Sequence, residues 1–402
     1  MKNRVDDFVY NLTDADFVKY NFDKSVAKIF FESQSYEKFG VDNNVISVGE
    51  HTSVTLKGNG QVEPFAAMIL CGGKATRFNG IFKAIYEIDN VFGDGVDRTF
   101  LEINIRQILK FECEHSVKVP IIIYDDFGTH DPIVDCLELN NYFGKSKDDY
   151  YFVEQTSGLR YLPSLDLLDN LGLGNFLSKE ERKIFPPETN VFITSQKDDT
   201  FVGTGHFVFN ALINSKEFVR LLKNEPSLNR LVVCNCDNLG KKYYSSLLSS
   251  RFENCMITTY KQVDEKMDGV YIDLNNNYLI IPYFSEVNFK SNVGFTGTIY
   301  LTISDILKCY GFKDVDSFVY YSGEDVKIDN RYYPILKRIA NRQNSTITLH
   351  FESVLAEISK FIQLKPMMVD RDLGFFPFKS ISDLNDNYLD EWKSSVLKNN
   401  YL

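Results

Sequence analysis

The stretch "MILCGGKATRFNGIFKAIYEI", residues 68–88, joins an apolar run to two glycines and then places three cations within ten residues. These cations are Lys74, Arg77 and Lys83. A buried strand seldom ends in unpaired positive charge, because burying a charge without a partner is costly. The stretch therefore raises the possibility of a negatively charged ligand at the end of this strand.

Apolar and amphipathic segments alternate from Pro64 onward. Strand-like runs, each apolar and bounded by polar or turn residues, occupy residues 65–71, 119–125, 150–155, 230–237 and 256–261. Residues 99–115 and 207–224 carry apolar residues at intervals of three and four, which is typical of helices. This alternation predicts an α/β fold with a mostly parallel sheet flanked by helices, in which ligands bind at the carboxyl ends of the strands.

The composition excludes several classes of function. The chain has 402 residues and a formal net charge of -11, which argues against a broad nucleic-acid surface but allows a small anion site. No apolar run approaches the roughly 18–20 residues of a membrane span, and residues 1–12 lack the apolar core of a signal peptide. The seven cysteines are scattered, so we expect reduced thiols in a cytoplasmic protein.

Two of the predicted strand ends carry residues with two possible roles. Gly72 and Gly73 allow main-chain N–H groups to approach a polyphosphate, but they also suit an ordinary tight turn. Asp237 stands at the carboxyl end of the strand predicted at 230–237 and precedes Asn238 and Gly240. Its carboxylate suits Mg²⁺, which needs only one or two protein carboxylates beside phosphate oxygens, and it also suits an Asx-turn that ends the strand.

Two further segments are equally open when taken alone. Gly205 and His206 lie in a loop of small residues just before a predicted helix, so they face either a nucleotide or solvent. Lys379 follows Pro377, whose ring stiffens the approach of the lysine, although a lysine near a C-terminus is usually just solvated. None of these segments decides the function by itself.

Taken in order, the segments resemble the UDP-sugar pyrophosphorylase family, and among its members the UTP–glucose-1-phosphate uridylyltransferases. The resemblance runs from about residue 66 to 384. It rests on motifs in a shared order: "LCGGKAT" from Leu70, the lysine at position 83, "TFLEINIRQI" from Thr99, "IIIYDDFGTH", the strand with Gln155, Gly205-His206, "NCDNLG" and "LGFFPFKSISDL". The last two are fairly specific.

The resemblance implies a Rossmann-like nucleotide-diphosphate-sugar transferase fold and a Mg²⁺-dependent transfer from UTP to a sugar 1-phosphate. The order of segments along the chain, together with the resemblance, divides the chain into an N-terminal helical segment (1–60), a catalytic domain (61–320) and a C-terminal closing segment or small subdomain (321–402). In that last part, residues 350–362 are predicted to form a helix. We expect a monomer or weak oligomer that binds neither nucleic acid nor membrane.

The resemblance also implies roles for individual residues. The triphosphate is expected at the glycine loop, and Asp237 is expected to bind Mg²⁺. The implied catalytic residues are Arg77, Lys83 and Lys379. The implied nucleotide-binding residues are Leu70, Gly72, Gly73, Gln155 and Gly205, of which Gln155 and Gly205 would contact the uracil. The implied substrate-binding residues are His206, Glu286 and Thr298.

The chain departs from the family pattern at several of these motifs. Ala75 replaces the third signature glycine, Phe82 replaces the proline before the lysine, and Phe207-Val208 follow Gly-His where the family has Gly-Asp. Thr298, in "GFTGTIYL", stands where the family has paired asparagines that contact the sugar. Glucose is therefore one of several possible sugars, and the level of activity is open.

Two rival functions follow from the same residues. A UDP-sugar-dependent glycosyltransferase often holds its metal through an Asp-x-Asp pair, whereas this chain has Asn235-x-Asp237. A non-catalytic relative would bind UTP or a UDP-sugar without turnover, which Ala75 and Phe207-Val208 make conceivable. Release of pyrophosphate from UTP separates both alternatives from uridylyl transfer.

Overall fold

The computed structural model provides the fold for most of the chain from residue 61 onward. It describes residues 46–47, 61–72, 78, 81–155, 160–162, 165, 169, 174, 177–183, 192–193, 208–249, 253–262, 267–273, 275–281, 291–321, 333–340, 345–352, 355–385 and 387–398. Contacts divide the chain into two units, the larger comprising residues 44–155, 208–329 and 355–402, and the smaller 1–43, 156–207 and 330–354.

A ten-stranded mixed sheet forms the centre of the larger unit, with its main path in the order β1-β11-β13-β9-β2-β5-β6. Strands β9 (Arg230–Asn235), β2 (Phe65–Leu70), β5 (Ile121–Asp125) and β6 (Tyr150–Glu154) are parallel neighbours. The remaining strands are β1 (Ile46–Ser47), β10 (Cys255–Tyr260), β11 (Gly269–Ile272), β12 (Tyr278–Ile281), β13 (Val293–Thr302) and β16 (Lys365–Met368). The parallel strands are buried on both faces, which explains their uninterrupted apolar sequences.

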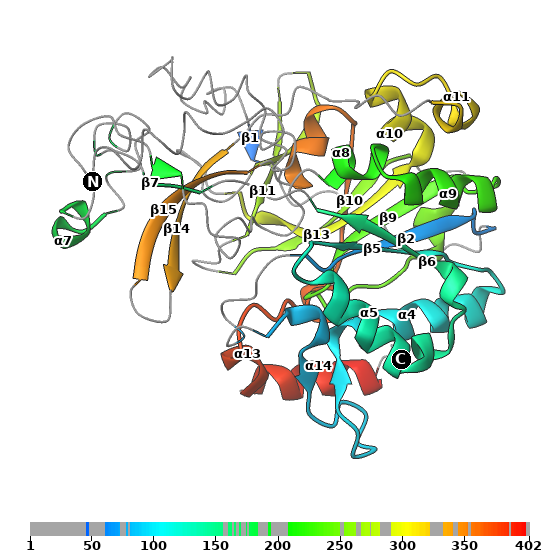
Figure 1. Ribbon diagram of the computed structural model, residues 1–402, viewed down its shortest axis with the longest axis horizontal. Coiled ribbons are helices and arrows are strands. Elements are labelled where there is room, and N and C mark those ends of the chain that lie inside the picture. The colour runs from blue at the N-terminus through cyan, green and yellow to red at the C-terminus, as the bar shows by residue number, and fades with distance from the viewer. Residues whose placement is uncertain are drawn as a thin grey trace. The chain divides into compact units, whose positions relative to one another are not determined.

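Helices cover both faces of this sheet (Figure 1). One face carries α4 (Phe100–His115), α5 (His130–Leu139) and α14 (Asn387–Lys398), and the other carries α8 (Val208–Ile213), α9 (Lys216–Asn224), α10 (Ile303–Cys309) and α11 (Val315–Val319). Shorter elements connect them: η2 (Lys83–Ile85), η3 (Asn141–Gly144), η4 (Lys147–Asp149), η7 (Ser245–Leu248), η9 (Leu355–Lys360), α12 (Arg371–Gly374) and α13 (Ser382–Asn385). The predicted α/β class is confirmed.

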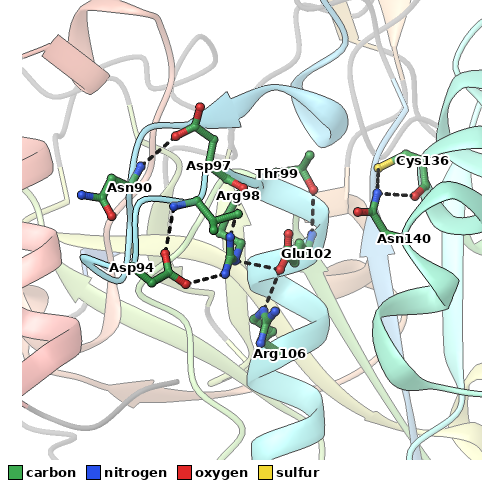
Figure 2. Close-up of polar contacts among 10 residues, drawn as sticks. Asn90, Asp94, Asp97, Arg98, Thr99, Glu102, Arg106, Cys136 and Asn140 are labelled. Carbon is green, nitrogen blue, oxygen red and sulfur yellow. Dashed lines mark hydrogen bonds and ion pairs between the residues drawn. The ribbon is translucent and has the colours of Figure 1, made fainter.

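The start of α4 is fixed by a compact polar network, shown in Figure 2. Thr99 caps the helix, because its hydroxyl accepts a hydrogen bond of 3.0 Å from the Glu102 amide. The Glu102 carboxylate accepts a hydrogen bond of 2.7 Å from Nε of Arg106 and forms an ion pair with Arg98, whose Nε lies 2.9 Å away. Arg98 also donates a hydrogen bond of 2.6 Å to Asp94. The network ties the hairpin of β3 (Glu87–Ile88) and β4 (Arg98–Thr99) to the first turns of the helix.

The predicted strands are all present, but two predicted helices differ from the structure. Within the helix predicted at 207–224, the described residues form two helices, α8 and α9. The break occurs because the Ser215 hydroxyl accepts a hydrogen bond from the Glu217 backbone amide and starts a new helix. The prediction of a helix at 350–362 was wrong for its first residues. Residues 345–352 form a strand, β15, which pairs with β14 over eight residues. Of the predicted helix, the described residues that are helical are 355–360, as a 3-10 helix.

The smaller unit contains a four-stranded antiparallel sheet in the order β14-β15-β7-β8. Its strands are β14 (Tyr333–Ala340), β15 (Ser345–Glu352), β7 (Arg160–Leu162) and β8 (Phe192–Ile193), and a short helix α7 (Lys179–Arg182) accompanies them. Residues 355–385 and 387–398 belong to the larger unit, which they enter through pairing of β16 with β10. The division predicted at 1–60, 61–320 and 321–402 stays a prediction, and the helices expected in 1–60 lie outside the described residues.

Strand β5 ends in a buried acid that is paired with a histidine. The Asp125 side chain is fully buried, and its Oδ2 lies 2.7 Å from Nδ1 of His130 at the start of α5. Burial raises the pKa of Asp125 to about 7, although His130 opposes the rise. The negative charges of Asp126 and Glu154 add to the upward shift.

We predict a pH-dependent stability that originates at Asp125. Because its pKa is raised in the folded state, folding is favoured at low pH, and this stabilisation is lost as the pH rises from about 4 to about 7. Replacing Asp125 by Asn keeps an oxygen acceptor for His130 but removes the titration. Thermal unfolding of both proteins between these pH values tests this: the wild-type Tm should fall by a few degrees relative to the Asp125→Asn variant. Parallel Tm curves would contradict the assignment.

Candidate active site

The carboxyl ends of four parallel strands bring distant residues together. Leu70 ends β2, and its Cα partners are Tyr124 on β5 and Asn235 on β9. The segments that follow β9, β2, β5 and β6 therefore emerge side by side at one edge of the sheet, where α/β proteins place their ligands. Asp237, Gly72 and Gln155 all lie in these segments.

Gly72 and Gln155 are in direct contact at this edge. The backbone amide of Gly72 donates a hydrogen bond of 2.9 Å to the Tyr124 carbonyl. The backbone amide of Gln155 donates one of 2.5 Å to the Asp125 carbonyl. A Cβ atom at position 72 would lie 2.5 Å from Oε1 of Gln155, which is too close for any real side chain. A side chain at residue 72 would therefore displace the carboxamide of the buried Gln155 from its present position.

Lys83 and Lys379 meet on a single carboxylate oxygen. Nζ of Lys83, at the start of η2, donates to Oδ2 of Asp237 at 2.9 Å. Nζ of Lys379 donates to the same oxygen, also at 2.9 Å. The sequence predicted these three residues for one site, and the structure brings them together although they come from three separate segments.

The electrostatics of this cluster favour an anion. Burial alone would raise the pKa of the Asp237 carboxyl, but the ammonium groups of Lys379 and Lys83 outweigh burial and hold the pKa well below its ordinary value. One carboxylate is thus paired with two ammonium groups, which leaves one net positive charge. The Lys83 side chain is 23% exposed and the Lys379 side chain 49%, so both amines remain accessible to a ligand.

The segment that carries Lys379 is bound to the loop that carries Asp237. The amide of Phe378 donates to the Asp237 carbonyl at 3.0 Å, and the amide of Leu239 donates to the Phe376 carbonyl at 3.1 Å. Asn238 and Pro377 form an antiparallel β-bridge between these two hydrogen bonds. The pairing fixes the backbones of both segments and so determines where the two charged side chains meet.

Three buried polar residues that the sequence analysis did not identify support the same loop. Nδ2 of Asn104 donates to the Cys236 carbonyl at 3.0 Å, and Nε2 of Gln107 donates to the Leu239 carbonyl at 2.9 Å. The ammonium group of Lys241 donates to Oδ1 of Asn104. Asn104 and Gln107 interrupt the apolar face of α4, and that interruption was the signal that could have revealed them.

Thr298 lies on β13, next to β9 but not beside Asn235. Its Cα partner is Cys234, and directly paired residues of an antiparallel ladder point to the same face of the sheet. Cys234 belongs to the core cluster under α4, and Thr298 is itself buried. The residue that lies against Asn235 is Gly297. A Cβ atom at position 297 would collide with the side-chain Nδ2 of Asn235. The sugar contact predicted for Thr298 stays a prediction.

Several predicted site residues lie outside the described residues. These are Gly73, Arg77, Gly205, His206 and Glu286. Their roles therefore stay predictions from the sequence.

Asp237 is also the residue for which Mg²⁺ was predicted. Its Oδ1 is buried and has no hydrogen-bond partner among the described residues, so one carboxylate oxygen is left over for a further ligand. Within the described part of the chain, no group of three or more His, Cys, Asp or Glu side chains suits a metal ion. This donor set fits a Mg²⁺ ion that takes most of its ligands from phosphate and water.

Comparisons with known proteins agree with the fold and the motifs. A family model described as UTP–glucose-1-phosphate uridylyltransferase matches residues 41–395. A search of curated proteins gave no match.

Among solved structures, the chain is 15% identical to UDP-glucose phosphorylase from Trypanosoma brucei, with a TM-score of 0.61, over 94% of this chain and 75% of that one. It is 14% identical to a UDP-glucose pyrophosphorylase variant from Leishmania major in complex with UDP-glucose, with a TM-score of 0.62, over 93% and 75%.

The uridine diphosphate N-acetylglucosamine pyrophosphorylase from Trypanosoma brucei is 15% identical, with a TM-score of 0.56 over 84% of this chain. The chain spans 65% of the length of that protein. These structural likenesses establish a shared fold, and the family match covers most of the sequence. The chain belongs to the UTP–glucose-1-phosphate uridylyltransferase family.

Proposed function

We propose that the protein transfers the uridylyl group of UTP to a sugar 1-phosphate and releases pyrophosphate. The observation that carries the proposal is the pair of ammonium groups, from Lys83 and Lys379, on the buried carboxylate of Asp237. This cluster follows β9, and β9 is the direct neighbour of β2, whose end leads to Gly72 and its contact with Gln155. Family membership supports UTP or UDP-sugar and a sugar phosphate as the substrates.

The chemistry of the reaction explains why cations dominate the site. The attacking group is a sugar phosphate oxygen, which is already anionic near neutral pH, so no general base is needed to activate it. Two polyanions must nevertheless approach each other, and negative charge shifts toward the leaving pyrophosphate. Phosphoryl-type transfer of this kind depends on positioning and electrostatic stabilisation rather than on covalent catalysis.

In the described residues, nucleotide binding and stabilisation of the phosphate charge would fall to two separate groups of side chains. Leu70, Gly72 and Gln155 would bind the nucleotide, with the Gln155 amide able to hydrogen-bond the uracil edge. The ammonium groups of Lys83 and Lys379 would exchange part of their contact with Asp237 for contacts with phosphate oxygens. Phosphate groups offer more negative charge than one carboxylate. The amines are already gathered before any phosphate arrives, so little reorganisation is needed.

Asp237 would hold Mg²⁺ together with phosphate oxygens, as its free Oδ1 supports. When bound, the ion would supply positive charge that neutralises the phosphates. The roles predicted for Arg77, Gly73, Gly205, His206, Glu286 and Thr298 complete the proposed site and rest on the sequence.

The cellular location and the oligomeric state are further parts of the proposal. None of the helices that the structure describes combines the length and apolar character needed to cross a bilayer. We infer a cytoplasmic location, which is supported by the seven cysteines all being free thiols. We also propose that the protein acts as a monomer or weak oligomer.

One assay tests the proposed function. The purified protein is incubated with UTP, Mg²⁺ and a panel of sugar 1-phosphates that includes glucose 1-phosphate and N-acetylglucosamine 1-phosphate, and pyrophosphate release is measured. Release with one or more sugars is expected. Binding of UTP without release would identify a non-catalytic relative, and sugar transfer from a UDP-sugar without pyrophosphate release would identify a glycosyltransferase.

We predict that both lysines of the cluster are essential for turnover. Replacing either Lys83 or Lys379 by Ala should lower kcat by about two orders of magnitude or more, the scale seen for single preorganised donors. Lys147→Ala is a suitable control, because Lys147 is exposed and its partners among the described residues are Glu138 and Tyr142, away from the cluster. Near-normal turnover in either cluster variant would remove that lysine from the site.

The role of Asp237 is tested by a substitution that preserves its shape. Asp237→Asn should lose activity by a similar factor at every Mg²⁺ concentration, because the amide neither holds the two ammonium groups nor offers an anionic metal ligand. Asp149→Asn is the matched control, since that acid pairs with Lys118 before β6, at the opposite ends of the strands. An active Asp237→Asn enzyme that still requires Mg²⁺ would refute the metal role.

A further inference from the structure

The C-terminal helix α14 carries a tryptophan that contacts the segments of Asp237 and Lys379. Trp392 is the only tryptophan in the chain, and its side chain is completely buried. Its indole Nε1 donates to the Leu239 carbonyl at 3.3 Å. Its ring packs edge-on against Phe378, with the ring centroids 5.6 Å apart and the planes at 83°.

These two contacts join two of the three segments that form the cluster. Leu239 lies two residues after Asp237, and Phe378 lies directly before Lys379. Trp392 therefore contacts both members of the backbone pairing that brings this acid and this lysine together. A shift of the indole would therefore change its contacts with both segments.

The surrounding contacts indicate that the indole orients these segments rather than merely satisfying a buried polar group. The Leu239 carbonyl also accepts Nε2 of Gln107 at 2.9 Å, so it remains hydrogen-bonded without the indole. The Phe378 ring likewise contacts Phe100 and Tyr388 as well as Trp392. Loss of the indole N–H would thus leave every group with a partner but would relax the angle between the two segments.

We propose that Trp392 is a positioning residue that sets the separation of the Lys379 amine and the Asp237 carboxylate. The importance of Trp392 for turnover rests on the proposed function, whereas its effect on the geometry of the two segments does not. A displacement of about 1 Å at a positioned group can cost about 10²-fold in rate. A partial displacement should therefore reduce kcat while leaving the nucleotide contacts of Gly72 and Gln155 intact.

Trp392→Phe is the variant that tests this inference, because it keeps an aromatic ring against Phe378 and removes the indole N–H. We expect kcat for pyrophosphate release to fall about tenfold, with KM for UTP changed by less than about threefold. Phe318→Leu is the matched control. Phe318 is equally buried but packs against Phe218 and Phe312 near α9, so its variant should lose thermal stability while keeping its kcat.

Hydrogen exchange gives a second readout that does not depend on activity. In Trp392→Phe, the amides of Leu239, Phe376 and Phe378 should exchange about tenfold faster, because their hydrogen bonds join the two segments. Phe318→Leu should leave these three amides unchanged. If Trp392→Phe does not fold, Phe378→Leu removes the same ring contact from the other side and should give the same exchange pattern.

The outcomes separate the two proposals. Wild-type exchange at these amides in the Trp392→Phe variant would overturn the positioning role, whatever happens to kcat. Faster exchange with an unchanged kcat would also overturn it, because the cluster geometry would then not limit turnover. If the wild-type protein releases no pyrophosphate with any sugar, the proposed function fails, and the exchange experiment still decides whether Trp392 holds the two segments together.

Discussion

One carboxylate oxygen shared by two ammonium groups is the interaction on which the site depends. Asp237 lies at the end of a buried strand, and Lys83 and Lys379 reach it from segments far away in the sequence. Two ammonium groups in contact would repel each other, and the carboxylate between them removes most of that repulsion. The acid thus has a structural task besides any metal binding: it keeps two amines within reach of a single ligand. The remaining positive charge is what an incoming polyphosphate would meet.

The sheet makes this arrangement possible. Parallel pairing of β9, β2, β5 and β6 places their carboxyl ends at one edge, so that residues with no relation in sequence become neighbours. The edge has two chemically different parts. Between β2 and β6 lies the uncharged contact of Gly72 with Gln155, and beyond β9 lies the charged cluster.

The sequence predicted the strands and the charged cluster but not the groups that support them. Apolar runs bounded by turns identify buried strands reliably, and Lys83, Asp237 and Lys379 each stand in a motif with a recognisable order. The break between α8 and α9 depends on one serine cap, which competes with a continuous apolar pattern. The strand at 345–352 is stabilised by pairing with β14, a partner that local periodicity does not reveal. Asn104 and Gln107 leave a signal in the sequence, because they interrupt the apolar face of α4. Lys241 and Trp392 act through contacts with residues distant in sequence, so their importance emerges only from the folded chain.

The β-bridge between Asn238 and Pro377 has a consequence for synthesis of the protein. Every strand of the large sheet precedes residue 377 in the chain, and Lys379 and α14 come after it. During synthesis, every strand of the large sheet therefore precedes the segment that supplies the second amine. The Lys379 ammonium group can therefore reach Asp237 only after every strand of the large sheet has been synthesised.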